Sequence, residues 1–392
     1  MSLDDSATRR LEEASRTPTG AAGRRVVFVN RYFHPDHSAT SQIMSDLVFH
    51  LASRGWEVLV ITGRQRYDDA SARLSASESV RGVRIVRVWS TRFGRAGLPG
   101  RAMDYLTFYA SSLVALRKQQ RGSIVVAATD PPLLSVIAAL ASRRVVNWTQ
   151  DLFPEVAEAL GIRIPFVRRV RDWSLRRARA NVVLGELMAA RVPKAVVIHN
   201  WADGALRPVD RQEGSVFTVG YSGNLGRAHE FETIVGAMRK MPDLRFAFTG
   251  GGARLAAVKA AAPSNAEFRD YVPRERLSES LSSADAHLVS LQPSLEGLIV
   301  PSKFYGILAV ARPVIFIGAR DGELSRLIDH YHCGMVVDPG DVDGLVRSLR
   351  MLADDHGQAA AMGLRGRELY LHRFAPEHAF AAWERLLEEC AA

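Results

Sequence analysis

The sequence predicts an α/β fold made of two Rossmann-like parallel-sheet domains that face each other across a cleft. Short apolar runs that favour strands alternate with segments of helical periodicity along the whole chain, which is typical of parallel sheets covered by helices. The 392 residues suffice for two domains of ordinary size. The alternation also begins anew just past mid-chain, where a strand, a glycine turn and a helix follow one another in 218–233.

This pattern divides the chain into four parts. The last helix has an apolar stripe that requires a partner surface, and we expect it to cross back onto the first domain. The parts are a mobile N-terminal tail at 1–24, an N-terminal Rossmann-like domain at 25–203, a C-terminal Rossmann-like domain at 204–374, and the final helix at 375–392.

The predicted strands place particular loops at one edge of each sheet. In the first half the strands cover 25–30, 56–62, 83–89, 124–128, 145–149, 181–184 and 195–198. In the second half they cover 215–219, 244–248, 267–271, 286–290, 313–317 and 335–337. Ligands of parallel sheets bind beyond the carboxyl ends of the strands. The loops there should face each other: 31–40, 129–132 and 150–155 from the first domain, and 223–229, 250–252 and 293–303 from the second.

Three evenly spaced glycines, Gly220, Gly223 and Gly226, follow the first strand of the second half. A glycine turn between a strand and a helix presents backbone N–H groups to an anion, usually a phosphate. A turn without a ligand gives the same pattern. A nicotinamide-binding domain would show Gly-x-Gly-x-x-Gly and an acidic residue after the next strand, but that strand ends in Thr249 and three glycines, 250–252. The dinucleotide interpretation is therefore disfavoured, and a nucleoside diphosphate remains open.

Composition excludes several classes of protein. Hydrophobic residues make up 47% and charged residues 24% of the chain, which is typical of globular proteins. Cys333 and Cys390 are the only cysteines, which suits a reducing compartment and offers no zinc-binding spacing. We find no signal peptide, and no apolar run is long enough to span a bilayer. Asp341-Val342-Asp343 resembles a metal-binding motif, but it opens a predicted helix, and helix capping explains it better.

The net charge of +9 is concentrated in one segment, Arg163 to Arg179, which holds seven arginines and a single acid. Phe166 and Trp173 lie among them. Basic residues mixed with aromatic ones suit an anionic membrane or a nucleic acid, and no nucleic-acid-binding motif accompanies them. A solvated helix face is the alternative. A second segment, 92–116, joins arginines to an aromatic helix face, which core packing also explains.

Six motifs, taken together and in order, resemble a known family. They are 32–35 (YFHP), 150–155 (QDLFPE), 199–203 (HNWAD), 220–226 (GYSGNLG), 249–252 (TGGG) and 296–303 (EGLIVPSK). From about residue 25 to its end, the chain resembles the retaining glycosyltransferases of family four, which have the two-domain GT-B fold. The Pro-Ser-Lys form looks most like the branch that contains O-antigen, colanic-acid and fucosamine transferases.

The resemblance implies roles for individual residues. The catalytic candidates are Asp151 on the acceptor side, Glu296 for sugar hydroxyls and Lys303 for the diphosphate. The remaining donor candidates are Gly223, Asn224, Gly226, Arg227, His229, Gly250, Gly251, Tyr271, Val272, Arg274, Pro301, Ser302 and Tyr305. The acceptor-side candidates are His34, His37, Ser38, Thr40, Asp130 and Asn200. Capping of the helix after it is an alternative role for Asp151.

The sequence departs from the family pattern at several of these positions. Asn224 and His229 occupy the places of the arginine and lysine that usually clamp the diphosphate. The second glutamate of the family's Glu-x7-Glu falls on Phe304, or on Gly306 in an alignment by the helix. These departures leave the ribose contact and the role of Glu296 open, and Lys303 is the candidate that compensates.

The function implied is transfer of a sugar from a UDP- or GDP-linked donor to a saccharide, with retention and without a metal or other cofactor. The acceptor expected in this branch is a saccharide on a polyprenyl diphosphate. We therefore expect a cytoplasmic enzyme that is peripheral on the inner face of an anionic plasma membrane and that makes surface polysaccharide such as lipopolysaccharide. An inert GT-B scaffold that binds nucleotide, or a nicotinamide-dependent oxidoreductase, is the alternative.

Overall fold

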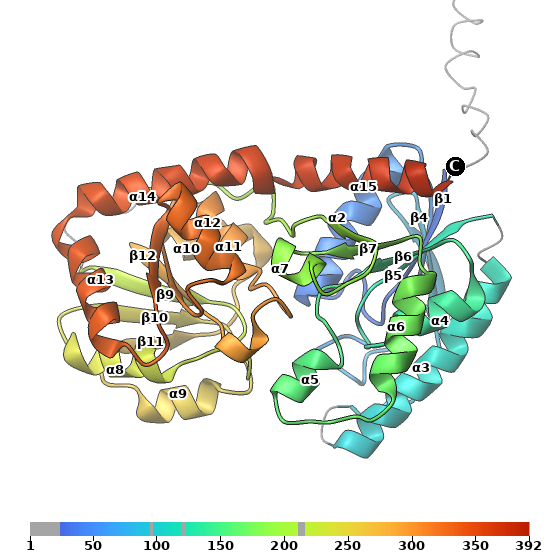
Figure 1. The fold of residues 1–392 in the computed structure, drawn as a ribbon, viewed down its shortest axis with the longest axis horizontal. Coiled ribbons are helices and arrows are strands. Elements are labelled where there is room, and N and C mark those ends of the chain that lie inside the picture. Colours follow the sequence, from blue (N-terminus) through green and yellow to red (C-terminus); the bar gives the residue numbers. More distant parts are fainter. Residues whose placement is uncertain (1–23, 95–96, 120–121, 211–215, 392) are drawn as a thin grey trace, which may run out of the picture.

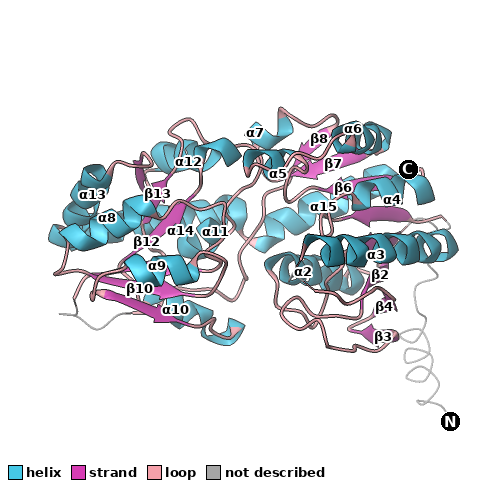
Figure 2. Cartoon of the chain, turned by 90° about the horizontal axis from the view of Figure 1, so that it is seen from below, coloured by secondary structure: helices cyan, strands magenta, loops and turns pink. Residues whose placement is uncertain are grey.

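In the computed structural model, which describes residues 24–94, 97–119, 122–210 and 216–391, the chain forms two α/β domains (Figure 1). The predicted tail at 1–24 lies almost wholly outside the described residues, as do Arg95 and residues 211–215 near the start of the second domain. Each domain is built on one sheet whose strands are flanked by helices (Figure 2).

The sheet of the N-terminal domain has eight strands in the order β3-β4-β2-β1-β5-β6-β7-β8. All neighbouring pairs are parallel except β3 and β4. The sequence analysis missed β3, because its short polar sequence Ser-Glu-Ser-Val shows no apolar alternation. The strands are β1 (Arg25–Val29), β2 (Glu57–Gly63), β3 (Ser77–Val80), β4 (Val83–Val88), β5 (Ile124–Ala127), β6 (Val145–Trp148), β7 (Ala180–Val183) and β8 (Ala195–Val197).

Helices cover both faces of this sheet. The residues of β1 alternate between them, so that Val26 and Phe28 pack with α2 and α15, and Val27 and Val29 pack with α3 and α4. The helices of this domain are α2 (Ala39–Ser53), α3 (Leu98–Gln119), α4 (Leu134–Ala141), α5 (Glu155–Ala159), α6 (Val167–Arg177) and α7 (Glu186–Ala189).

The C-terminal domain has a six-stranded sheet in the order β11-β10-β9-β12-β13-β14, with every neighbouring pair parallel. Its strands are β9 (Thr218–Ser222), β10 (Arg245–Thr249), β11 (Ala266–Arg269), β12 (Ala286–Ser290), β13 (Val314–Ile317) and β14 (Gly334–Val337). Its helices are α8 (Glu232–Lys240), α9 (Leu255–Ala261), α10 (Leu277–Ser282), α11 (Lys303–Ala309), α12 (Glu323–Tyr331), α13 (Val342–Asp354) and α14 (His356–Leu369), with the short helices η1 (Arg274–Arg276) and η2 (Pro293–Leu295). These two parallel sheets confirm the predicted fold class.

The chain returns to the first domain through α14, a π-helical turn η3 (Tyr370–Phe374) and α15 (Pro376–Ala391), which form a long arm along one side of the molecule (Figure 1). Trp383 of α15 is fully buried and packs against Trp148 of β6, with 4.8 Å between the ring centroids. The predicted crossing of the last helix is therefore confirmed.

The capping role of Asp341 is confirmed as well, since its carboxylate accepts a hydrogen bond from the Gly344 N–H of α13. In the described parts of the chain, none of the helices is long and apolar enough to cross a membrane.

Candidate functional site

Two glycine loops of the C-terminal domain interlock through their backbones. The Gly223 N–H donates to the carbonyl of Thr249, and the Leu225 N–H donates to that of Gly251. Gly250 has a φ of +132°, and a Cβ on it would lie 2.3 Å from the Gly223 carbonyl oxygen. Such contact excludes any side chain, so only glycine allows the loops after β9 and β10 to approach this closely. The result is a rigid surface of backbone at the carboxyl edge of the sheet.

Lys303, the first residue of α11, lies over this surface. Its ammonium donates to the Tyr221 hydroxyl at 2.6 Å and to the Asn224 carbonyl at 3.4 Å, and it lies 4.0 Å from the centroid of the Tyr221 ring. None of these partners neutralises the positive charge. Burial lowers the pKa of Lys303 to about 7, because desolvation disfavours the charged form. A cation held in this way favours the arrival of an anion, as predicted for the diphosphate.

His229 lies beside Lys303 but does not act as a second cation. Its Nδ1 lies 2.6 Å from the carbonyl oxygen of Ser290, and because a carbonyl only accepts, Nδ1 carries the proton. Burial, with the charge of Lys303, lowers the pKa of His229 to about 3. The ring is therefore neutral, and its Nε2 is a hydrogen-bond acceptor. The sequence predicted that His229 helps to clamp the diphosphate. In the ligand-free protein its ring is instead a neutral hydrogen-bond acceptor.

Other predicted donor residues are distributed around the same loops. Asn224 contributes its carbonyl to Lys303, Arg227 is exposed on the loop, and Tyr271 is 63% exposed. A Cβ on Gly251 would lie 3.2 Å from the Tyr271 ring, so the ring and the glycine loop are neighbours. An exposed ring beside a backbone surface offers a face on which a nucleotide base can stack. The loop that holds Pro301 and Ser302 leads directly into α11, and Val272 follows Tyr271.

Two residues predicted to bind the donor, Tyr305 and Arg274, instead make contacts within the core and between the domains. Tyr305 is 1% exposed and packs edge-on against Phe374 at 5.0 Å, so it belongs to the core of the C-terminal domain. Arg274 forms salt bridges with Asp46 of α2, at 3.0 Å, and with Asp203 at the end of the N-terminal domain. It therefore connects the two domains, and we remove both residues from the donor set.

Glu296 caps a helix in this structure. Its Oε1 accepts a hydrogen bond from the Glu323 N–H at 2.8 Å, at the start of α12, and burial raises the pKa of its carboxyl group. The sequence analysis missed Glu323, whose carboxylate accepts the N–H groups of Glu186 and Leu187 at the start of α7 in the other domain. An acidic residue in the first turn of a helix signals capping of that helix, but it does not reveal a partner in another domain.

Asp151 follows β6 at the boundary between the domains. The next residue, Leu152, donates its N–H to the carbonyl of Leu298 in the C-terminal domain at 2.9 Å, and Asp151 forms a bridge with Ile299. The carboxylate retains exposed surface but is surrounded by protein atoms, and this desolvation, with the nearby charge of Asp130, raises the pKa of Asp151 to about 6. The start of α5 has no side-chain cap, so the capping alternative does not hold.

The acceptor-side candidates lie at the same edge, because β1, β5 and β6 are neighbouring strands. Asp130 follows β5, and His34 packs edge-on against Phe49 with its pKa lowered by burial. His37 is exposed, whereas Ser38 and Thr40, at the start of α2, are half-buried. Asn200 is the exception, since it is 2% exposed and its amide is paired with that of Gln150. It therefore joins the loops after β8 and β6 rather than contacting a ligand.

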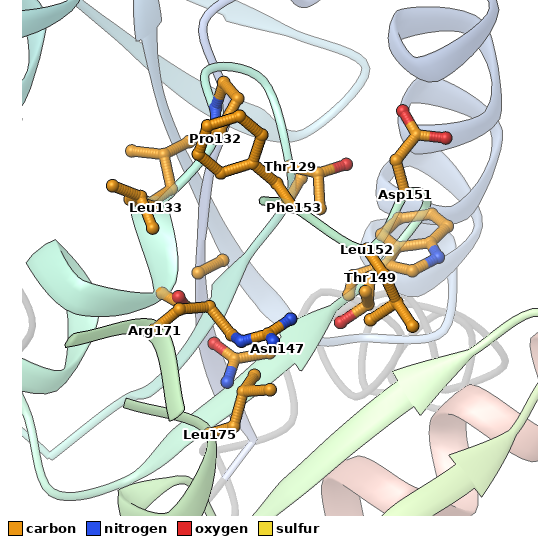
Figure 3. Close-up of a pocket in the computed structure, with 15 residues that line it drawn as sticks. Thr129, Pro132, Leu133, Asn147, Thr149, Asp151, Leu152, Phe153, Arg171 and Leu175 are labelled. Atoms are coloured by element: carbon orange, nitrogen blue, oxygen red, sulfur yellow. The ribbon is translucent and has the colours of Figure 1, made fainter. Parts of the chain in front are cut away.

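A small cavity of about 30 Å³ lies at this edge (Figure 3). It is formed by the loops that follow β5 and β6 and by one side of α6. Its apolar walls include Leu133, Leu152, Phe153 and Leu175, and its polar lining includes Asn147, Thr149, Asp151 and Arg171. Of this lining, only Asp151 was predicted from the sequence as a site residue.

Both parts of the chain match known families. Residues 39–201 match the family described as Glycosyl transferase 4-like domain, and residues 216–355 match Glycosyl transferases group 1. The probable glycosyltransferase WbjE of Pseudomonas aeruginosa is 30% identical over 264 residues, which cover 59% of this chain and 66% of WbjE. The putative colanic acid biosynthesis glycosyl transferase WcaI of Escherichia coli K12 is 23% identical over 378 residues, which cover 84% of this chain and 92% of WcaI.

Solved structures share the fold at lower sequence identity. Sucrose-phosphate synthase from Thermosynechococcus elongatus superposes with a TM-score of 0.77 at 16% identity, over 93% of this chain and 98% of that one. Anabaena HepE in complex with UDP-glucose superposes with a TM-score of 0.69 at 13% identity, over 93% of this chain and 99% of that one. At these identities the likeness shows a common fold.

Proposed function

Because the chain belongs to the glycosyltransferases of GT-B fold, with a glycosyl transferase 4-like domain followed by a group 1 domain, we propose that it transfers a sugar from a UDP- or GDP-linked donor to a saccharide. The observation that carries this proposal is the uncompensated ammonium of Lys303 over two interlocked glycine loops. Backbone and one cation at the carboxyl edge of a parallel sheet suit a diphosphate. The complex of HepE with UDP-glucose supports a nucleotide sugar as donor.

The proposed mechanism is displacement on the front face of the donor sugar, with retention. The bond from the anomeric carbon to the diphosphate oxygen breaks, and the acceptor oxygen forms its bond on the same face. Lys303 and those N–H groups of the glycine loop that do not hold the two loops together stabilise the leaving diphosphate, which takes the acceptor proton. Asp151, at the facing edge, orients the acceptor hydroxyl. Lys303 supplies positive charge where many phosphate sites use a metal ion, so we expect no metal requirement.

The acceptor and pathway are the finer parts of the proposal. WcaI is named for colanic acid biosynthesis, which supports a role in bacterial surface polysaccharide. We propose a saccharide on a polyprenyl diphosphate as acceptor, and hence action at the inner face of the plasma membrane. The lipid carrier requires a surface of the N-terminal domain that contacts lipid.

The outer layer formed by α3, α4 and α6 offers such a surface. On α6 and the turn before it, Phe166 is 74%, Val170 45% and Trp173 37% exposed. The outer side of α3 exposes an apolar stripe of Met103, Leu106 and Val114. Two of the seven arginines of 163–179 are paired with acids. Arg171 is buried between Glu155 and Asp172, and Arg168 pairs with Glu158. The other arginines of the run are exposed and lie near Phe166 and Trp173 in the sequence, and Arg177 lies over the Trp173 ring. This combination favours anionic lipid.

Flotation with vesicles tests the membrane contact. Changing Arg168, Arg169, Arg176 and Arg177 to glutamate should release the protein from anionic vesicles at low salt, because each basic residue contributes about 1 kcal/mol of attraction near the surface. A control variant with the same change of charge in the C-terminal domain replaces Arg245, Arg276, Arg326 and Arg347 and should still float. Equal flotation of the first variant and the parent protein contradicts this contact through α6.

A product assay tests the reaction itself and separates the alternatives. We expect stabilisation by a nucleoside diphosphate but not by a nicotinamide dinucleotide, and transfer with retention in the presence of a chelator, read by NMR of the anomeric proton. At one hundred times the dissociation constant a ligand stabilises by roughly 2.7 kcal/mol, which a thermal shift detects. Nucleotide binding without transfer to any lipid-linked saccharide would favour an inert scaffold, and inversion would overturn the mechanism.

A further inference from the structure

The cavity at the carboxyl edge of β5 and β6 has no role in donor binding, because it lies wholly within the N-terminal domain. We propose that it is a subsite for the N-acyl group of an acceptor sugar, such as the acetamido group of an N-acetylhexosamine. This inference rests on the proposed function for the identity of the acceptor. It follows from the chemistry of the lining, which offers one hydrogen-bond acceptor, one cationic donor and apolar walls.

The hydrogen-bond acceptor is the side-chain oxygen of Asn147. Asn181 uses both N–H groups of its amide, which donate to the carbonyls of Leu175 and Pro193. The Asn181 oxygen must therefore face Asn147, which donates its own N–H to it at 2.7 Å. This network fixes the orientation of the Asn147 amide and leaves its oxygen buried without a partner among the described residues. A buried acceptor without a donor costs about 1–3 kcal/mol, so an N–H from a ligand would be favourable there.

The cationic donor is Arg171 of α6. Its side chain is largely buried, with Nε donating to Asp172 and Nη2 to Glu155. Two carboxylates thus fix the plane of the guanidinium at the cavity. Figure 3 shows Asn147 and Arg171 close together on one side of the group of lining residues in that view and Asp151 on the other side. A group bound between Asn147 and Arg171 would place the rest of its sugar toward Asp151, where the proposed transfer occurs.

The walls and the size select the class of substituent. Leu133, Leu152 and Leu175 form apolar sides that suit a methyl group. The volume of about 30 Å³ holds about two water molecules, or a substituent of three or four heavy atoms. An acetamido group presents an N–H, a carbonyl oxygen and a methyl group, one for each part of the lining. A hydroxyl group would leave the apolar walls without a partner.

Saturation-transfer NMR tests the subsite with defined probes. The full chain, with UDP or GDP added, is compared with the methyl glycosides of N-acetylglucosamine and of glucose. We expect the acetyl methyl protons to receive the most saturation, because leucine side chains surround them. Asn147→Leu, which removes the acceptor, should weaken binding about tenfold, the effect of one lost buried hydrogen bond. Leu133→Phe should also weaken binding, because the larger side chain fills the cavity.

A matched control checks that these effects are local. Asn200→Leu breaks the other buried amide pair of the domain, outside the cavity, and should leave the acetyl signal unchanged. Equal saturation of both glycosides, or an acetyl signal that survives in both cavity variants, overturns the subsite. Nucleotide binding in the C-terminal domain is read separately by thermal shift. If the protein binds nucleotide but does not prefer the acetylated glycoside, the subsite is refuted and the proposed function is not. If it prefers the acetylated glycoside but does not bind nucleotide, the proposed function is refuted and the subsite is not.

Discussion

The two domains share an architecture, but the edges that face each other present different chemical groups. The edge of the C-terminal domain is mainly backbone, with two interlocked glycine loops and the uncompensated ammonium of Lys303. The edge of the N-terminal domain is made of side chains, with Asp130, Asp151 and a partly apolar cavity. Backbone N–H groups suit a phosphate, whereas the side chains of the N-terminal edge can contact a differently shaped ligand. We infer that the two halves divide donor and acceptor between them.

Replacing Lys303 with alanine should have the largest effect on this division. A lost charge-assisted hydrogen bond costs about 1.5–3 kcal/mol, so the affinity for UDP or GDP should fall up to about 100-fold. The affinity for the corresponding nucleoside should remain unchanged, since the nucleoside carries no phosphate. Calorimetry measures both. Asp151→Asn, at the opposite edge, is the control and should leave both affinities intact, and an equal loss for nucleotide and nucleoside would remove Lys303 from the diphosphate site.

Acid should destabilise the C-terminal domain before the N-terminal one. His287 of β12 is 2% exposed and packs against Gly220, and burial lowers its pKa to about 4. The unfolded chain binds a proton as the pH falls through 6.5, so stability falls as the pH drops from 6.5 toward 4, by roughly 2 to 3 kcal/mol at pH 4.5. His229, with its lowered pKa, acts in the same direction.

The distribution of tryptophan makes this difference measurable. All six tryptophans lie outside 204–374, so their fluorescence reports the N-terminal domain and α15, whereas circular dichroism reports both domains. In urea at pH 4.5 the dichroism should change before the fluorescence, and His287→Phe should reduce that gap. Coincident transitions at both pH values would show that the domains unfold as one unit.

The pH dependence of nucleotide binding isolates the role of the Lys303 charge. Its pKa in the free protein is lowered to about 7, and only the protonated form attracts the diphosphate. The affinity should therefore be full below pH 7 and fall as the pH rises through 7, by about tenfold from pH 6 to pH 8. Binding at pH 8 should take up a proton, which calorimetry in buffers of different ionisation enthalpy detects. In Lys303→Ala the affinity should not change over this range.

The smallest effect is expected at the contact between the edges. The salt bridge from Arg274 to Asp46 is partly exposed, and such pairs contribute at most about 1 kcal/mol. Arg274→Met should therefore raise, by a few-fold, the fraction of molecules in which the two domains have moved apart. Small-angle scattering without nucleotide would show this as a slightly larger radius of gyration. Arg276→Met, which loses only a pair with Glu279 on the same surface, should leave the radius unchanged. An equal increase of the radius of gyration in both variants would show that Arg274 does not hold the two domains together.

The glycine loops of the C-terminal edge could be predicted from the sequence for a physical reason. The close approach of Gly250 to Gly223 demands glycine, so composition and spacing reveal it. The short strand β3 has no such signature. Arg274, Tyr305 and Asn200 were predicted by position in motifs, but their partners lie far away in sequence, at Asp46, Phe374 and Gln150. Partner choice over such distances depends on packing, which local patterns do not encode.

The cavity illustrates the same limit. Asn147 and Arg171 come from β6 and α6, and each looks unremarkable in its own segment of the sequence. Only the pairing of Asn147 with Asn181 exposes an amide oxygen that needs a donor. The motif around Asp151 was recognised from the sequence, whereas the cavity beside it required the packed sheet.

Hydrogen–deuterium exchange with and without a nucleoside diphosphate is the sharpest test of this division between donor and acceptor, because it reports every loop at once. UDP or GDP, whichever raises the melting temperature, should slow exchange in the glycine loops at 222–229 and 249–254 and around Lys303. We expect little change in the N-terminal loops at 31–40 and 149–153. Protection of those loops, with none in the glycine loops, would contradict the assignment of the donor to the C-terminal domain.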